Sequence, residues 1–116
     1  MLSMPQKTVL SAGGKTTKPR RFVFVLLDNF TLLSFAAALD CLRLANRMSG
    51  HDLYSWHIVT EGGGIVRCST QTAIETDGDL DELHRDDTVI LCGGAEVQKA
   101  TSKKLLNWLR REVRKG

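Results

Sequence analysis

The stretch Thr88–Glu96, which reads TVILCGGAE, constrains the fold more than any other part of the chain. An apolar run without alternation is typical of a strand buried on both faces, as in a parallel sheet covered by helices. The run leads into Gly93–Gly94, and a helical pattern follows from about Thr101. Parallel sheets bind ligands just beyond the carboxyl ends of their strands, and glycines there let the backbone amides approach a ligand. The same residues also fit a plain strand-to-helix turn.

Two more segments have the pattern of buried parallel strands. Phe22–Leu27 (FVFVLL) is an uninterrupted apolar run, and Tyr54–Thr60 (YSWHIVT) is the second strand of a βαβ unit. Thr31–Met48 between them has helical periodicity and ends at Ser49–Gly50, where Gly50 suits a left-handed cap. The periodicity places one set of side chains on the buried face of this helix: Leu32, Phe35, Ala36, Leu39, Leu42 and Ala45. A second set falls on the exposed face: Asp40, Arg43 and Arg47.

The second half of the chain contains shorter elements. Val66–Ser69 and Thr72–Glu75 are predicted to form a small hairpin, and Asp77–Leu83 an acidic connection with one helical turn. Thr101 or Ser102 can cap a last helix. Its predicted apolar stripe consists of Leu105, Leu106, Trp108, Leu109 and Val113. The pattern indicates an α/β fold. Three strands are few for a doubly wound sheet, so we expect a domain that is incomplete at its C-terminus.

The charges are distributed unevenly along the chain. Residues 1–21 carry five Lys/Arg and no acid, residues 22–98 carry twelve acids and four bases, and residues 99–116 carry seven bases and one acid. Residues 1–20 are predicted to be a disordered basic leader, with a mitochondrial transit peptide as a less favoured alternative. The basic ends could contact nucleic acid, but a solvated tail and a solvated helix face explain them as well. No apolar run reaches the roughly 18 residues that span a bilayer, so we expect no membrane contact and a cytoplasmic protein.

Several common site motifs are absent from the sequence. No G-x-G-x-x-G follows the first strand, and no G-x-S-x-G is present. Asp77, Asp79 and Asp81 lack the spacing of a calcium loop, so no metal site is expected, and no cofactor is indicated. The three cysteines are scattered, and Cys92 is interpreted as a packed apolar residue although it ends a strand.

The segments FVFVLLDNFTLLSFAAALDCLRLAN, YSWHIVTEGGGIVRCS and DTVILCGG resemble the PfpI-like branch of the class I glutamine amidotransferase superfamily. More narrowly, they are similar to the N-terminal domain of AraC-type transcriptional regulators of the GlxA-like group. The resemblance covers residues 21–116, and it implies a flavodoxin-like sheet sandwiched by helices. These residues would then be the N-terminal part of such a domain, truncated before the nucleophile elbow and the helix-turn-helix region.

The resemblance also implies a site. Family enzymes form an oxyanion hole with a glycine pair that matches Gly93–Gly94, beside a cysteine on a later elbow. An acidic side chain usually supports that cysteine, and the matching position here is Ser34, which has no carboxylate. The usual Gly-Pro of the first helix is Ala37–Ala38, and no cysteine of this chain matches the nucleophile. These departures argue against catalysis.

The sequence therefore predicts an effector-sensing and dimerising domain of an AraC-family regulator, which binds a small nitrogenous metabolite and does not itself read DNA. Ligand-binding residues are predicted to be Gly93, Gly94, Ser34, Asp28 and Asn29, with no catalytic residue. On this hypothesis, Gly94→Val abolishes effector binding but leaves the fold intact. The alternatives are a cysteine-dependent hydrolase or glyoxalase-like enzyme of the same superfamily, and an inactive orphan half-domain.

Overall fold

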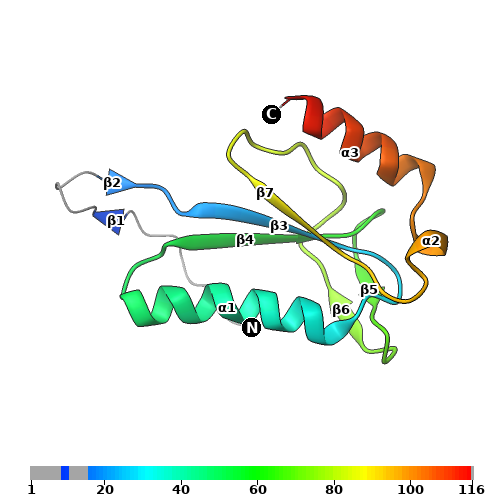
Figure 1. Ribbon diagram of the computed structural model, residues 1–116, viewed down its shortest axis with the longest axis horizontal. Helices are drawn as coiled ribbons and strands as arrows, with labels where there is room; N and C mark the ends of the chain where they lie inside the picture. The colour runs from blue at the N-terminus through cyan, green and yellow to red at the C-terminus, as the bar shows by residue number, and fades with distance from the viewer. Residues whose placement is uncertain (1–8, 11–15, 116) are drawn as a thin grey trace.

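The computed structural model describes residues 9–10 and 16–115. Figure 1 shows a sheet seen nearly along its plane, with α1 below it and α3 above it. None of the described helices is long and apolar enough to cross a membrane. The elements in chain order are β1 (Val9–Leu10), β2 (Thr16–Thr17), β3 (Arg20–Leu26), α1 (Leu32–Ser49), β4 (Tyr54–Val59), β5 (Ile65–Arg67), β6 (Ala73–Glu75), β7 (Thr88–Cys92), α2 (Val97–Ala100) and α3 (Lys103–Lys115).

The three predicted buried strands form one parallel sheet in the order β4-β3-β7. At its centre, Phe24 of β3 lies opposite Ile58 of β4 and Ile90 of β7. The parallel arrangement is confirmed. The strand that lies first in sequence is therefore the central strand, and the other two flank it.

Alternate residues of β3 enter two separate cores. Phe24 and Leu26 pack on the α1 side, where Phe35 meets Phe24 edge-to-face with ring centroids 5.5 Å apart. Val23 and Val25 pack on the other side with Leu105 of α3. A strand that is buried on both faces needs apolar side chains on both, which explains why β3 has no polar face. The predicted α/β sandwich is confirmed.

α1 ends as predicted, because Gly50 adopts a left-handed φ of 74° and its N–H donates to the Asn46 carbonyl at 3.1 Å. Phe35 and Leu39 are buried, and Leu42 packs against them. The prediction was wrong for Ala36, which is exposed. The sheet is three strands wide, so it covers fewer side chains of α1 than the apolar pattern of the helix predicts.

α3 begins where expected, since the Leu105 N–H donates to the Ser102 Oγ at 3.0 Å. Leu105 and Trp108 are buried, but Leu106 and Val113 of the predicted stripe are 39% and 75% exposed. Their place on the buried face is taken by Glu112, whose Oε1 accepts the Leu83 N–H at 2.7 Å. A carboxylate with a hydrogen-bond donor can replace an apolar residue in a core. The short helix α2 was not predicted.

The segment between β6 and β7 has no helical turn, so that prediction was wrong. Asp77 accepts the Ile58 N–H at 2.8 Å and Asp79 accepts the Gly62 N–H at 2.7 Å, which fastens the segment to β4 and its loop. Trp108 donates its indole N–H to the Asp81 carbonyl at 3.0 Å. Short acidic side chains that bind backbone amides compete with helix formation. The predicted hairpin is confirmed as β5–β6, with Val66 opposite Ile74.

Most of the predicted leader, residues 1–20, lies outside the described residues, and its disorder stays a prediction. Within it, β1 and β2 pair antiparallel with each other and not with the parallel sheet. Arg20, which was assigned to the leader, is the first residue of β3 and lies opposite Tyr54.

Adjacent leucines test the buried face of α3. Leu105 is fully buried and Leu106 is 39% exposed. We expect Leu105→Ala to lower the free energy of unfolding by about 2–5 kcal/mol, because it leaves a cavity. Leu106→Ala is the matched control and should cost less than about 1 kcal/mol. Urea denaturation of both variants measures the difference, and equal losses would refute this assignment of the buried face.

Candidate functional site

The carboxyl ends of β3 and β7 lie side by side, and the chain leaves the two strands toward opposite sides of the sheet. The chain leaves β3 through α1 toward β4 on one side, whereas β7, on the other side of β3, leads to α2 and α3. Open α/β sheets bind ligands in the crevice where successive connections diverge in this way. The loops after β3 and β7, which carry Asp28–Asn29 and Gly93–Gly94, flank this position.

Backbone contacts join the two loops directly. The Leu27 N–H donates to the Cys92 carbonyl at 3.0 Å, and the Thr31 N–H donates to the Gly93 carbonyl at 3.0 Å. A Cβ on Gly94 would lie 2.3 Å from the Asn29 carbonyl oxygen, which is closer than any real contact. Gly94 is therefore required by the close approach of the two backbones.

This contact corrects one expectation from the sequence. Gly94→Val was expected to abolish ligand binding without disturbing the fold. The Asn29 carbonyl is backbone and has no free rotamer, so any side chain at Gly94 must push the two loops apart. The substitution would change the fold and the site together, and different variants are needed to test binding.

The predicted ligand residues are only partly brought together. Asn29 and Gly94 touch through the Asn29 carbonyl, and Gly93 lies against Thr31. Asp28 and Ser34 are exposed, and in the described part of the chain no hydrogen bond joins either of them to the two glycines. Ser34 lies in the first turn of α1. The role of these five residues in binding stays a prediction.

The β5–β6 hairpin also reaches this end of the sheet, which sequence reasoning missed. The Asn29 N–H donates to the Arg67 carbonyl at 2.9 Å, and the Ser69 N–H donates to the Phe30 carbonyl at 2.8 Å. Gln71 donates its side-chain N–H to the Asn29 Oδ1 at 3.1 Å. The sequence predicted a hairpin of Val66–Ser69 and Thr72–Glu75, but nothing in this segment indicates which strand end the hairpin would reach.

The site is rich in backbone donors. α1 begins at Leu32 and has no acidic residue in its first turn, and the side chain of its N-cap, Thr31, makes no capping hydrogen bond. Within the described residues, no recorded hydrogen bond uses the amides of Gly93 and Gly94. Free amides and a helix N-terminus attract negative charge and lone pairs. This end of the sheet therefore suits a small ligand with a carboxylate or carbonyl oxygen.

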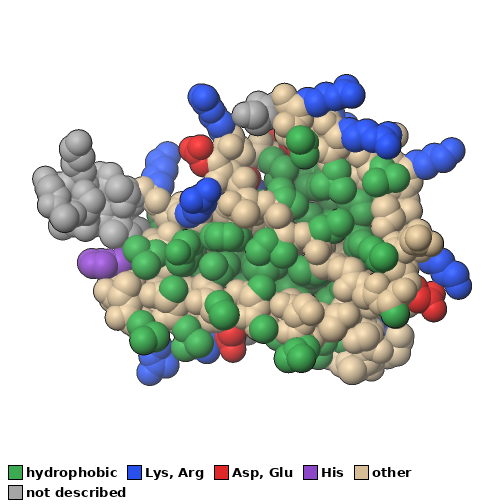
Figure 2. All heavy atoms as spheres, viewed as in Figure 1, with side chains coloured by type: hydrophobic (Ala, Val, Ile, Leu, Met, Phe, Trp, Pro, Cys, Tyr) green, Lys and Arg blue, Asp and Glu red, His purple; other side chains and the backbone are tan. Residues whose placement is uncertain are grey.

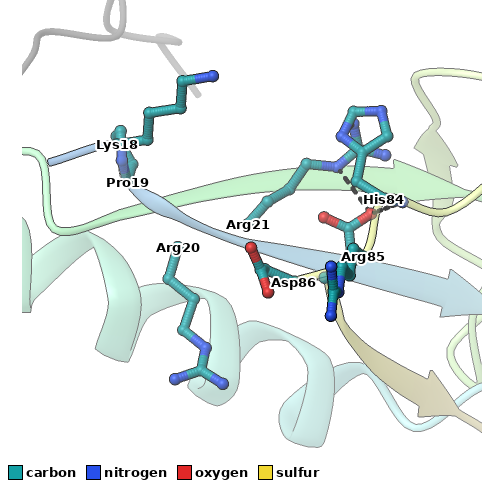
Figure 3. Close-up of a pocket in the computed structure, with 8 residues that line it drawn as sticks. Lys18, Pro19, Arg20, Arg21, His84, Arg85 and Asp86 are labelled. Carbon is teal, nitrogen blue, oxygen red and sulfur yellow. Dashed lines mark hydrogen bonds and ion pairs between the residues drawn. The ribbon is translucent and has the colours of Figure 1, made fainter. Parts of the chain in front are cut away.

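A cavity of about 500 Å³ lies at the opposite, amino end of the sheet. Its centre is an ion pair in which Arg21 Nε is 3.5 Å from Asp87 Oδ2. Figure 3 shows Arg21 and His84 turned toward one another, whereas Lys18 and Arg20 extend in opposite directions. The lining groups therefore do not converge on a common ligand position. They are Lys18, Pro19, Arg20, Arg21, His84, Arg85, Asp86 and Asp87.

Cys92 is buried at the end of β7, and burial raises the pKa of its thiol to about 11. At neutral pH the group is a thiol and a poor nucleophile. The interpretation of Cys92 as a packed side chain agrees with its burial. Of the three aspartates in the acidic segment, Asp77 and Asp79 accept different backbone amides. Asp77 and Asp81 also share His57, whose Nδ1 lies 3.7 Å from Asp77 Oδ2 and whose Nε2 lies 3.4 Å from Asp81 Oδ2.

Alkylation by iodoacetamide tests the state of Cys92. Cys41 is exposed on α1 and should be modified at pH 8, whereas Cys92 should stay unmodified in the folded chain. In the folded chain the pKa of the Cys92 thiol lies above its ordinary value of 9.0. The protonated thiol therefore contributes to stability below about pH 9, and this contribution is lost as the pH rises toward 11. Peptide mapping by mass spectrometry measures both sites, and equal labelling at pH 8 would contradict the burial.

The chain is similar in sequence to several transcription regulators. The chain is 39% identical over 98 residues to the HTH-type transcriptional regulator GbdR of Pseudomonas aeruginosa, an alignment that covers 84% of this chain and 27% of the relative. It is 37% identical over 95 residues to CdhR of the same organism, covering 82% of this chain and 28% of the relative. GlxA of Rhizobium meliloti is 32% identical over 90 residues, covering 75% of this chain and 27% of the relative. The chain thus spans about a quarter of the length of these regulators. No family model matches it.

Solved structures show the same fold. An AraC family transcriptional regulator from Pseudomonas putida superposes with a TM-score of 0.70 at 23% identity, over 84% of this chain and 61% of that one. A DJ-1 superfamily protein from Agrobacterium tumefaciens superposes with a TM-score of 0.57 at 22% identity, over 82% of this chain and 48% of that one. The chain is therefore similar in sequence to transcriptional regulators that include GlxA, and it shares its fold with an AraC family regulator and a DJ-1 superfamily protein, as its resemblance to PfpI-like N-terminal domains predicted.

Proposed function

We propose that the chain is the effector-sensing and dimerising part of an AraC-type transcriptional regulator, that it works in the cytoplasm, and that it leaves the reading of DNA sequence to another region. The observation that carries this proposal is the 39% identity to a transcription regulator over 84% of the chain. The resemblance implies a small nitrogenous metabolite as the effector. The proposed site is the crevice between the loops after β3 and β7.

The geometry of the crevice supports a binding role. Backbone amides at Gly93–Gly94 and at the start of α1 would donate hydrogen bonds to the carboxylate or carbonyl oxygen of the effector. Asn29, on the loop after β3, adds an exposed carboxamide that can donate and accept, and its Oδ1 accepts from Gln71 at 3.1 Å. Asn29 and Gly94 hold the two loops at a fixed separation. Binding groups that are already held in place lose little conformational freedom when a ligand binds.

The enzyme alternative has less support from the described residues. Ser34 replaces the carboxylate that would activate a nucleophile, and Cys92 is buried with a raised pKa. A cysteine hydrolase needs an activated thiolate next to its oxyanion hole. The relatives at 32–39% identity are named as transcriptional regulators. We therefore favour a sensing role.

Two residues with left-handed backbones provide a matched test of the effector site. Asn29 has a φ of 62° and Gln71 a φ of 66°, so glycine fits both positions without strain. Both substitutions remove the same Gln71–Asn29 hydrogen bond. If the Asn29 carboxamide binds the effector, Asn29→Gly should weaken binding about tenfold, or ~1.4 kcal/mol, and Gln71→Gly should have a smaller effect.

Isothermal titration calorimetry measures this difference. Amino acids, polyamines and quaternary ammonium compounds are titrated into the chain, and the variants are then tested with whichever compound binds. Equal affinities for the two variants would exclude Asn29 as a ligand residue. Failure of all three classes to bind would contradict the proposed effector chemistry.

Dimerisation has a candidate surface at β7. Within the described residues, the outer edge of β7 is not paired with another strand, and Leu91 on this strand is 43% exposed. Figure 2 shows hydrophobic side chains gathered on the face of the molecule where β7 lies in front. Open edges with apolar flanks pair readily with other chains. We expect this surface to contribute to the contact between two copies.

A charge placed on the edge tests this contact. Leu91→Lys should shift the chain toward monomer, because lysine on an edge strand opposes pairing. Leu33→Lys is the control, since Leu33 is 77% exposed on α1 at the other face of the sheet. Sedimentation velocity should show dimers for the native chain and for Leu33→Lys. A native chain that is monomeric at micromolar concentration would contradict dimerisation.

A further inference from the structure

The outer face of α3 carries positive charge only. Its exposed cations are Lys103, Lys104, Arg110, Arg111 and Arg114. The one acidic residue of the helix, Glu112, is turned inward, is 5% exposed and binds the Leu83 N–H. The buried face of α3 therefore holds the negative charge, and the exposed face has no carboxylate of its own.

The cations form an ordered row. Lys103, Arg110 and Arg114 are spaced by seven and four residues, so they lie along one ridge of the helix. Lys104 and Arg111 form a second ridge beside it, in which Arg111 Nε is paired with Glu112 Oε2 at 3.4 Å. Among the described residues, no ion pair joins Lys103, Arg110 or Arg114 to a carboxylate. Figure 2 shows Lys and Arg side chains projecting along the rim that α3 forms in Figure 1.

We infer that this face, the α3 basic face, binds the phosphate backbone of double-stranded DNA without reading its sequence. The inference goes beyond the proposed sensing role and depends only on the assignment of the chain to a transcription regulator. α3 is 13 residues long, or about 20 Å. B-DNA carries one negative charge per ~1.7 Å of its axis, so roughly ten phosphates lie within the length of the helix.

The face is not suited to reading bases. The apolar side of α3, which includes Leu105 and Trp108, is packed on the sheet, so the helix cannot enter a groove deeply. Long, flexible cations on a docked helix reach phosphates at the surface of the duplex instead. Such contacts hold a domain against DNA while another element selects the sequence.

Two pairs of arginines provide a matched test. Arg110 and Arg114 are one helical turn apart on α3, and Arg43 and Arg47 are one turn apart on α1, at the other face of the sheet. Arg110→Gln/Arg114→Gln and Arg43→Gln/Arg47→Gln remove the same charge. None of the four side chains is buried, so we expect both double variants to fold.

Fluorescence anisotropy of a labelled duplex of random sequence, measured from 50 to 200 mM salt, gives the affinity and its salt dependence. The native 116-residue chain should bind at 50 mM salt. Each lost phosphate contact lowers the slope of log affinity against log salt by about 0.9, so the α3 pair should lower it by about 1.8 and the α1 pair should leave it unchanged. Arg110→Lys/Arg114→Lys should keep the native slope, because the attraction depends on charge.

Three results would overturn the inference: no binding by the native chain at 50 mM salt, equal loss of slope in both arginine pairs, or competition by polyglutamate as strong as that by unlabelled duplex. The last result would assign the face to an acidic protein. None of these results bears on effector binding, which calorimetry tests separately on the same chain.

Discussion

The position of β3 at the centre of the sheet determines most of this structure. β3 pairs with β4 on one side and β7 on the other, so its backbone is bonded along both edges and its side chains are buried on both faces. α1 packs on one face of β3, where it meets the side chains of Phe24 and Leu26. α3 packs on the opposite face, where it meets the side chains of Val23 and Val25. The two helix layers and the position of the crevice all follow from this strand.

The proposed site depends on a second constraint, which is the close approach of two backbones. Gly94 lies against the Asn29 carbonyl, and Thr31 donates to the Gly93 carbonyl, so the loops after β7 and β3 are fixed relative to each other. The start of α1 is thereby held beside the glycine amides. The glycines have a structural role whether or not a ligand binds, which agrees with the plain turn that the sequence also allowed.

Long apolar patterns predicted the fold well, because burial on two faces leaves a clear signal in FVFVLL, YSWHIVT and TVILC. Predictions failed where contacts distant in sequence decide the outcome. Glu112 is buried in place of Val113 because the Leu83 amide supplies a donor from another segment. The acidic segment does not form a helical turn because Asp77 and Asp79 bind amides of β4 and its following loop. Gln71 joined the site through a hairpin whose position no local pattern indicates.

The proposed function depends on an effector that binds between the loops after β3 and β7. Chemical-shift mapping by NMR on the ¹⁵N-labelled chain, titrated with a compound that binds in calorimetry, tests it most directly. Binding at this place should shift the amide signals of Asn29, Gly93 and Gly94. It should leave unchanged the signals of Arg21, His84 and Asp87 around the cavity at the other end of the sheet. Shifts confined to that cavity would contradict the proposed site.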